Sequence, residues 1–250
     1  MAEMTSWQSP TTVWEDHSGR FKALNDWLQI DPERTVVITI DMHRGHLDED
    51  EATMPVTPEV SRRVLKPAGE FLRFARGAGI PIIHVILTWR PNEADRFNPR
   101  IAAGRMIFSS QAPTTKALAN GAVHNLVGSV QCELMPEIGP EEGDLIVNTK
   151  KTLSIYYGTE LDVLLGTFLD VDTVILMGIN TNTCVQCAAF ESMNRGYQVV
   201  VLEDCVGSMY GEDMHIAGLQ NIARCLGWVL NTEEAIDKIM AGKKVSEVAQ

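Results

Sequence analysis

Short, nearly continuous apolar runs recur along the chain, and segments with helical spacing separate them. Strands that are buried on both faces, as in a parallel sheet covered by helices, lack the usual polar alternation. The runs are also rich in β-branched residues, which favour strands. We therefore predict five strands and a weaker sixth, at residues 35–40, 80–87, 145–148, 173–177, 197–202 and 227–230.

Helical periodicity fills the intervals between these runs. The clearest case is 58–77, where Val64, Phe71 and Leu72 share one face and glycines follow. Alternation of strands and helices is typical of βαβ units with right-handed crossovers. We predict the α/β class: a three-layer α/β/α, doubly wound, mainly parallel sheet of about six strands. The expected helices span 58–77, 159–169, 183–195, 212–225 and 233–240.

The two ends of the pattern define the expected domain organisation. Residues 1–30 are polar but carry Trp7, Trp14 and Trp27. We predict an N-terminal arm or lid, because tryptophans usually bury something, with a frayed terminus as the alternative. Residues 90–140 are weakly patterned, and we expect a long excursion over the sheet. Residues 31–250 then form a single domain.

Composition narrows the class of protein. The 250 residues include 21 Lys and Arg against 33 Asp and Glu, so the net charge is −12 and a nucleic-acid partner is not expected. The five cysteines are an odd, sparse set, unlike a secreted disulfide framework. No signal peptide and no bilayer-length apolar run is evident, so we expect a cytoplasmic protein with no membrane partner.

Polar residues follow the predicted strands where a doubly wound sheet binds its ligands, beyond the carboxyl ends. Asp41 follows the first strand, where a carboxylate is a ligand, a base or a loop cap. Lys150 and Lys151 follow the third, and one of the two points inward. An ammonium beside a carboxylate and a thiol stabilises both anions.

Cys184 lies in GINTNTC, which leaves the fourth strand and enters a helix. With Asn182 or Thr183 as N-cap, Cys184 falls in the first helical turn, where free N–H groups favour a thiolate and an oxyanion. Position alone leaves two interpretations open, a nucleophile or a buried space-filler. Cys184 and Cys187 also have redox spacing, C-x-x-C, without the Trp-Cys-Gly-Pro context of thioredoxins.

Read together, these positions resemble the isochorismatase-like cysteine hydrolases, which include N-carbamoylsarcosine amidase, nicotinamidase, and biuret and ureidoacrylate amidohydrolases. The resemblance rests on VVITIDM (36–42), NTKKTLSIYYGTELDVLL (148–165) and VILMGINTNTCVQCAAFESMNRGYQVVVLEDCVGS (174–208), with a weaker EDMHIAGLQNI (212–222). These segments occur in the family's order and are spread over nearly the whole predicted domain.

The resemblance implies roles for individual residues. Asp41 matches the general base and Cys184 the nucleophile, while Lys150 matches the catalytic lysine because it lies four residues before Ser154. The family's non-proline cis peptide falls at Ile179–Asn180. The backbone amides of Asn180 and Cys184 would then form the oxyanion hole.

The resemblance also shapes the expected chemistry. It implies an amidohydrolase without a cofactor, acting through a thioester on a small polar amide, carbamoyl or ureido compound, in a homodimer or homotetramer. True isochorismatases lack the nucleophilic cysteine. The alternatives are a catalytically silent binding member of the fold and a thiol redox protein that uses Cys184 and Cys187.

The chain departs from the family where a substrate is usually met. After Asp41 the sequence is Met-His-Arg-Gly-His, and Ser-Ile-Tyr replaces the usual Ser-Ala-Phe. We expect His43, Arg90, Tyr156 and Asn180 to contact the substrate, with Arg96 near the pocket mouth. The segment TWRPNEADRFNPR has no histidine, so the nicotinamidase metal site is not expected. His43 and His46 are three residues apart, but a histidine pair in a loop more often forms hydrogen bonds than binds a metal.

Overall fold

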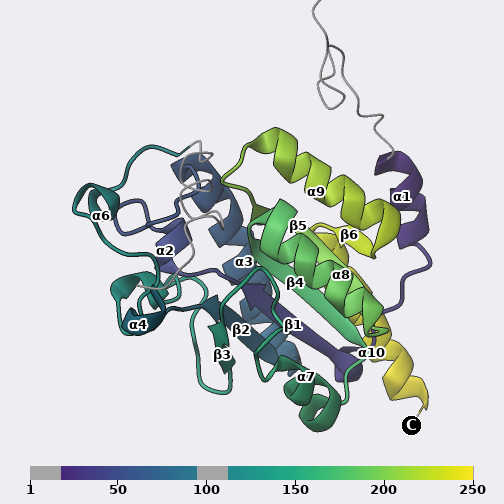
Figure 1. Ribbon diagram of the computed structural model, residues 1–250. Helices are drawn as coiled ribbons and strands as arrows, with labels where there is room; N and C mark the ends of the chain where they lie inside the picture. The colour runs from purple at the N-terminus through teal and green to yellow at the C-terminus, as the bar shows by residue number, and fades with distance from the viewer. Residues whose placement is uncertain (1–17, 95–111, 250) are drawn as a thin grey trace, which may run out of the picture.

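The computed structural model describes residues 18–94 and 112–249. Its centre is a six-stranded sheet in the order β3-β2-β1-β4-β5-β6, and every neighbouring pair is parallel (Figure 1). The predicted α/β class and strand number are confirmed. The strands are β1 (Thr35–Ile40), β2 (Ile82–Leu87), β3 (Leu145–Lys150), β4 (Thr173–Ile179), β5 (Gln198–Gly207) and β6 (Trp228–Leu230).

Helices cover both faces of the sheet, which gives three layers (Figure 1). The apolar residues of α3 (Pro58–Ala78) and α10 (Thr232–Ala249) share one core cluster with the sheet. A second cluster joins the other face to α8 (Gln186–Asn194), α9 (Glu212–Cys225), α7 (Leu161–Val163) and the π-helical turn η3 (Leu164–Leu169). The sheet is therefore buried on both sides, as its uninterrupted apolar strands predict.

The helix α3 shows how local sequence sets the boundaries of an element. The Thr57 hydroxyl accepts a hydrogen bond from the Val60 N–H at 3.4 Å, and Pro58 occupies the first turn. The helix ends at Ala78, and Gly79, with φ of 79°, is its left-handed C-cap. The predicted range of 58–77 is therefore one residue short.

The N-terminal region is partly described. Trp7 and Trp14 lie outside the described residues, while α1 (Ser18–Asn25) packs near α9 and β6. Trp27 is 81% exposed, so the expectation that it buries something is wrong for this residue; Leu28 and Ile30 enter the core instead. The domain boundary at residue 30 stays a prediction.

The long excursion between β2 and β3 returns to the carboxyl edge of the sheet. It contains α4 (Pro91–Ala94), α6 (Lys116–Ala119) and the short 3-10 turn η2 (Val130–Cys132). Single β-bridges join Trp89 to Leu126 and His43 to Leu134. The excursion is thereby fixed against the segments that follow β1 and β2, including α2 (Arg44–Leu47).

Close approach of β1 and β4 brings their ends together. Gly178 is paired with Ile40 and has φ of 134°. A Cβ at Gly178 would lie 2.0 Å from the Ile40 carbonyl oxygen, so only glycine fits there. Asp41 follows the end of β1, and Asn180 follows the end of β4, at the carboxyl edge of the sheet. None of the helices within 18–94 and 112–249 is long and apolar enough to cross a membrane.

Candidate active site

Three side chains from three strand ends meet at the carboxyl edge of the sheet. The Lys150 Nζ donates to Asp41 Oδ2 at 2.5 Å and to Cys184 Sγ at 3.4 Å. Asp41, Lys150 and Cys184 are 1%, 0% and 5% exposed. The structure therefore brings together the three residues to which the resemblance assigns the chemistry, in a site screened from water.

The turn after β1 aims the Asp41 carboxylate. Asp41 has φ of 55°, a left-handed conformation that aspartate tolerates better than most residues. Its N–H donates to the Val85 carbonyl at 2.9 Å, and its Oδ1 accepts from the Leu87 N–H at 2.9 Å. The end of β2 thus orients one oxygen, and Lys150 orients the other.

The two adjacent lysines have different positions. Lys150 points into the site, whereas the Lys151 Nζ donates to the Thr88 carbonyl at 2.6 Å and pairs with Glu93 at 2.8 Å. Alternation along the end of β3 turns these neighbours to opposite sides. The choice that the spacing alone left open is therefore decided by geometry in favour of Lys150.

Cys184 lies in a π-helical turn, η4 (Thr181–Val185), which precedes α8. The residue at the N-cap is Asn180, whose carbonyl accepts from the Thr183 and Val185 N–H groups at 3.1 Å each. The expectation of Asn182 or Thr183 as N-cap of an α-helix is wrong, because the wider turn begins earlier. The Ile179–Asn180 peptide bond is cis.

Burial and charge set the protonation of the three groups. Burial acts to raise the pKa of Asp41, but the Lys150 ammonium outweighs it, so this pKa lies below its usual value. Burial acts to lower the pKa of Lys150, but Asp41 and Cys184 raise it overall. Burial raises the pKa of the Cys184 thiol to about 12, against the opposing effect of Lys150.

These shifts describe a resting site with a carboxylate, an ammonium and a neutral thiol. The Asp41 carboxylate hydrogen-bonds the Cys184 thiol, which itself helps to raise the pKa of the thiol. The expectation of a thiolate stabilised at a helix N-terminus gives way to a thiol beside a base. A nucleophile of this kind is activated only when the base takes its proton.

The predicted substrate contacts occupy varied positions. The Asn180 Oδ1 accepts from the Met209 N–H at 2.8 Å, and its side chain is buried. The Tyr156 hydroxyl shares a 2.8 Å hydrogen bond with the Ser192 hydroxyl, and the Arg195 guanidinium lies 3.9 Å from its ring centroid. The Tyr156 hydroxyl is thus engaged with α8, so the expectation that it serves a substrate has no support in its contacts.

Two further predicted contacts differ in exposure. His43 is fully buried, and its Nε2 lies 3.9 Å from Asp41 Oδ1 and 2.8 Å from the Asn125 amide nitrogen. The Arg90 side chain is 68% exposed and pairs with Glu93 at 3.5 Å. Arg96 lies outside the described residues. His43 is therefore adjacent to Asp41, while Arg90 lies at the surface.

Sequence reasoning missed two residues of the excursion, His124 and Asn125. The His124 ring centroid lies 5.2 Å from that of His46 and 5.9 Å from that of His43. No sequence motif marks this segment, and the contact between Asn125 and His43 spans 82 residues of chain. The path of the excursion, which brings these two residues to His43, is fixed by β-bridges that the sequence pattern does not reveal.

The histidines do not form a recognisable metal centre. Within the described ranges, no group of three or more His, Cys, Asp or Glu side chains has an arrangement suited to a metal ion. The His46 Nδ1 instead donates to the Met54 carbonyl at 2.6 Å. The expectation of a metal-free site stays a prediction.

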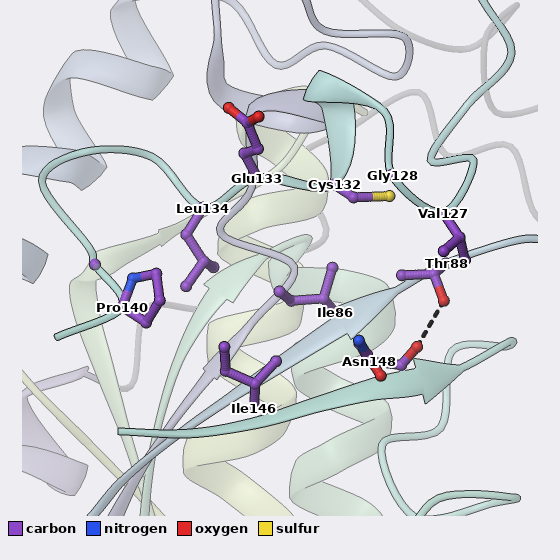
Figure 2. Close-up of a pocket in the computed structure, with 11 residues that line it drawn as sticks. Ile86, Thr88, Val127, Gly128, Cys132, Glu133, Leu134, Pro140, Ile146 and Asn148 are labelled. Carbon is purple, nitrogen blue, oxygen red and sulfur yellow. Dashed lines mark hydrogen bonds between the residues drawn. The ribbon is translucent and has the colours of Figure 1, made fainter. Parts of the chain in front are cut away.

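A cavity of about 430 Å³ is lined by residues of β2 and β3 and of the excursion between them (Figure 2). Figure 2 shows its apolar wall, with Ile86, Ile146 and Leu134, and the hydrogen bond from the Thr88 hydroxyl to the Asn148 carbonyl at 2.6 Å. None of Asp41, Lys150 and Cys184 lines it. Its size would suit a small ligand.

Cys184 and Cys187 are both free thiols. The Cys187 thiol donates to a Glu191 carboxylate oxygen at 3.8 Å, and burial together with that carboxylate raises the pKa of Cys187 to about 11. A redox pair needs a thiol that ionises readily. Neither member of this pair meets that condition.

Comparison with known proteins agrees with the geometry. The model of the isochorismatase domain family matches residues 35–234, which is most of the chain. The chain belongs to the isochorismatase family. Its match spans all six strands and the three residues of the candidate site.

Isochorismatase-family relatives include named amidohydrolases. The chain is 28% identical over 218 residues to the ureidoacrylate amidohydrolase of Methylobacterium radiotolerans, covering 81% of this chain and 78% of the relative. It is 29% identical over 209 residues to the maleamate amidohydrolase of Pseudomonas putida, covering 82% and 87%. A cysteine hydrolase structure from Pseudomonas syringae has a TM-score of 0.68 at 26% identity, covering 86% of this chain and 96% of that one.

Proposed function

We propose that this isochorismatase-family protein is a cysteine-dependent amidohydrolase that cleaves the C–N bond of a small polar amide, carbamoyl or ureido compound. The observation that carries the proposal is the contact of one buried ammonium, Lys150, with both the Asp41 carboxylate and the Cys184 thiol. A base, a nucleophile and a fixed cation within hydrogen-bond reach form the arrangement that nucleophilic catalysis requires.

The first half of the proposed reaction forms a thioester. Asp41 takes the thiol proton while Cys184 Sγ attacks the carbonyl carbon, so that a C–S bond forms and the carbonyl oxygen becomes an oxyanion. The backbone N–H groups of Asn180 and Cys184 would hold that oxyanion. Asp41 then gives its proton to the leaving nitrogen, the C–N bond breaks, and ammonia or an amine departs.

The second half releases the acid. Asp41 takes a proton from water, whose oxygen attacks the thioester carbon. The C–S bond breaks, and Asp41 returns the proton to Cys184. Lys150 keeps its proton throughout, because its raised pKa favours the ammonium, and it keeps the carboxylate in place as the charge on sulfur develops.

The polar class of substrate is supported by the relatives and by the surroundings of the site. The named relatives act on ureidoacrylate and maleamate, which are small polar amides. Near Asp41 the buried walls carry imidazole and amide groups from His43 and Asn125. Such groups favour a substrate that forms hydrogen bonds over a purely apolar one.

The silent-member and redox alternatives are less well supported. A silent member would have no need for a buried Lys–Asp pair, which is costly to desolvate. A redox protein would use Cys187, whose thiol is engaged with Glu191. A cytoplasmic location and a homodimer or homotetramer remain predictions, and light scattering after gel filtration tests the assembly.

Ammonia release from a panel of small amides, ureides and carbamoyl compounds tests the function. The matched variants are Cys184→Ser and Cys187→Ser, which make the same change three residues apart. We expect Cys184→Ser to lose at least about 1,000-fold in turnover and to keep its melting temperature, while Cys187→Ser keeps most activity. Equal losses in both variants would favour the redox alternative, and turnover by Cys184→Ser would remove this cysteine from the mechanism.

A further inference from the structure

Polar side chains that the proposed mechanism does not use surround the turn after β1. The rings of His43 and His46 stack with centroids 4.8 Å apart, and His124 lies beside both. Asn125 is fully buried and has φ of 51°. These residues come from α2, from its N-cap and from the excursion, and they lie near the carboxylate that acts as base in the proposed mechanism.

One amide nitrogen joins two of these elements. The Asn125 Nδ2 donates to the Leu87 carbonyl at 2.8 Å and lies 2.8 Å from His43 Nε2. A carbonyl oxygen only accepts, so the amide atom that faces Leu87 must be the nitrogen. Its second hydrogen then points at His43 Nε2, which must carry a lone pair.

The tautomer of His43 follows from this contact. With a lone pair on Nε2, the ring proton lies on Nδ1, and the Gln131 backbone hydrogen-bonds the ring. Protonation of His43 would set two N–H groups against each other at Asn125. Asn125 therefore adds to the burial that keeps His43 neutral, and a neutral ring of this tautomer has no proton on Nε2 to give to Asp41 Oδ1, 3.9 Å away.

The same nitrogen acts on the base through the backbone. The Leu87 N–H orients Asp41 Oδ1 at 2.9 Å. Asn125 holds the Leu87 carbonyl with its side chain and receives the Trp89 N–H with its own carbonyl at 2.8 Å. The end of β2, which aims the carboxylate, is thus fixed at two points by one residue.

The other end of the amide makes no hydrogen bond. The Asn125 Oδ1 is buried with no partner, and a Cβ on Gly45 would lie 2.2 Å from it. A buried unpaired acceptor costs stability. Stability alone therefore does not account for an asparagine here, whereas the two contacts of its nitrogen do.

The charged and titratable groups that face His43 come from several elements. They are Asp41 at the end of β1, His46 on α2, His124 on the excursion and Lys150 on β3. Burial, then His46 and Lys150, hold the pKa of His43 well below its usual value. Lys150 is consequently the cation that pairs with Asp41.

We propose that Asn125 is a positioning residue for the general base: its amide nitrogen holds the Leu87 peptide against Asp41 and keeps His43 from donating to the carboxylate. The inference rests on the proposed function, because it takes Asp41 to be the base for Cys184. Loss of the nitrogen lets His43 gain a proton on Nε2, which then competes for Asp41.

The test compares Asn125→Asp and Asn125→Gly with the wild type. Both replacements tolerate a positive φ; the first keeps the shape but removes the donor, and the second removes the side chain. The rate of Cys184 alkylation by iodoacetamide, followed by intact mass from pH 5 to pH 9, needs no substrate. Asp41→Asn must slow this reaction if it reports on the base.

The expected result is a new acid limb from protonation of His43 in both Asn125 variants. We expect alkylation at pH 5, the acid end of the range, to slow by about tenfold or more, and kcat to fall similarly while KM changes by less than about threefold. Adding His43→Asn to Asn125→Asp should remove the new acid limb. The alkylation rate should still be lower than in the wild type, because the Leu87 peptide that orients Asp41 is no longer held.

The matched control is Asp170→Asn, an isosteric change at another left-handed position, with φ of 46° on the surface. It should change neither profile. Folded Asn125 variants with the wild-type pH profile and kcat would overturn the proposal. A wild type that alkylates through Asp41 but releases no ammonia would refute the proposed function alone, and the alkylation profiles would still decide the role of Asn125.

Discussion

Two buried clusters of charged groups lie on the same sheet and differ in how fully they are satisfied. At one edge, Asp144 accepts from Arg76 at 2.7 Å, from the Glu141 N–H at 2.8 Å and from His84 at 3.1 Å. The other ring nitrogen of His84, Nδ1, forms a 2.7 Å hydrogen bond with the Thr39 hydroxyl. Every polar group in this cluster has its partners, so it holds the fold together and leaves nothing to react.

The cluster at the carboxyl edge is arranged differently. Asp41 has one backbone donor and one ammonium, and its third neighbour is a thiol whose proton can move. His43 approaches Asp41 but remains at 3.9 Å with its proton directed away. Under the proposed mechanism, the comparison indicates that a buried carboxylate acts as a base when it also faces a transferable proton.

Removal of the cation from each cluster should separate them most clearly. Lys150→Met leaves the Asp41 charge buried and unpaired, so we expect a loss of about 3–5 kcal/mol in the free energy of unfolding, together with loss of turnover. Arg76→Met leaves Asp144 with His84 and a backbone donor, so a loss of about 2 kcal/mol and retention of kcat are expected. Urea unfolding and ammonia release measure both. Comparable kcat losses in the two variants would contradict the distinction between a structural cluster at Asp144 and a reactive cluster at Asp41.

The pH profile is the next largest effect. The pKa of Asp41 is lowered, so its ionised form stabilises the fold above its unfolded pKa of 3.8, and this stability is lost as pH falls through the lower folded value. The pKa of the Cys184 thiol is near 12, and burial keeps the histidines neutral. We therefore expect kcat/KM to be flat from about pH 5 to about pH 9. An acid limb near pH 6.5 in the wild type would mean that a histidine is charged in the site.

The smallest effect is expected where a polar contact is fully satisfied outside both clusters. Tyr156→Phe removes the hydrogen bond to Ser192, so we expect a loss of about 1 kcal/mol in stability and a change in kcat/KM of less than about twofold. Thermal unfolding and steady-state kinetics measure it. A large rise in KM would restore Tyr156 as a substrate contact.

Much of the fold could be predicted because its physical cause is local. All six apolar runs overlap strands over most of their length, since burial on both faces leaves a direct sequence signal. The polar ends were missed, as in β3, which continues through Thr149 to Lys150, and in β5, which continues to Gly207. Polar residues at strand ends carry the site and do not resemble strands.

The candidate site divides in the same way. Asp41, Lys150 and Cys184 could be identified because they follow strands in an order that the family shares. The π-helical turn at Cys184 and the contact of Asn125 with His43 could not. The first depends on one extra residue in a turn, and the second on a long excursion whose path no periodic pattern specifies.

The central claim is that Asp41 and Lys150 activate Cys184 to form a thioester. Acid quenching of the wild type during turnover of an amide that releases ammonia, followed by intact-mass and peptide mapping, tests it most directly. We predict a transient acyl adduct on Cys184 that is absent in Cys184→Ser and that forms far more slowly in Asp41→Asn. Ammonia release by Cys184→Ser, or an adduct that maps to Cys187, would contradict the account.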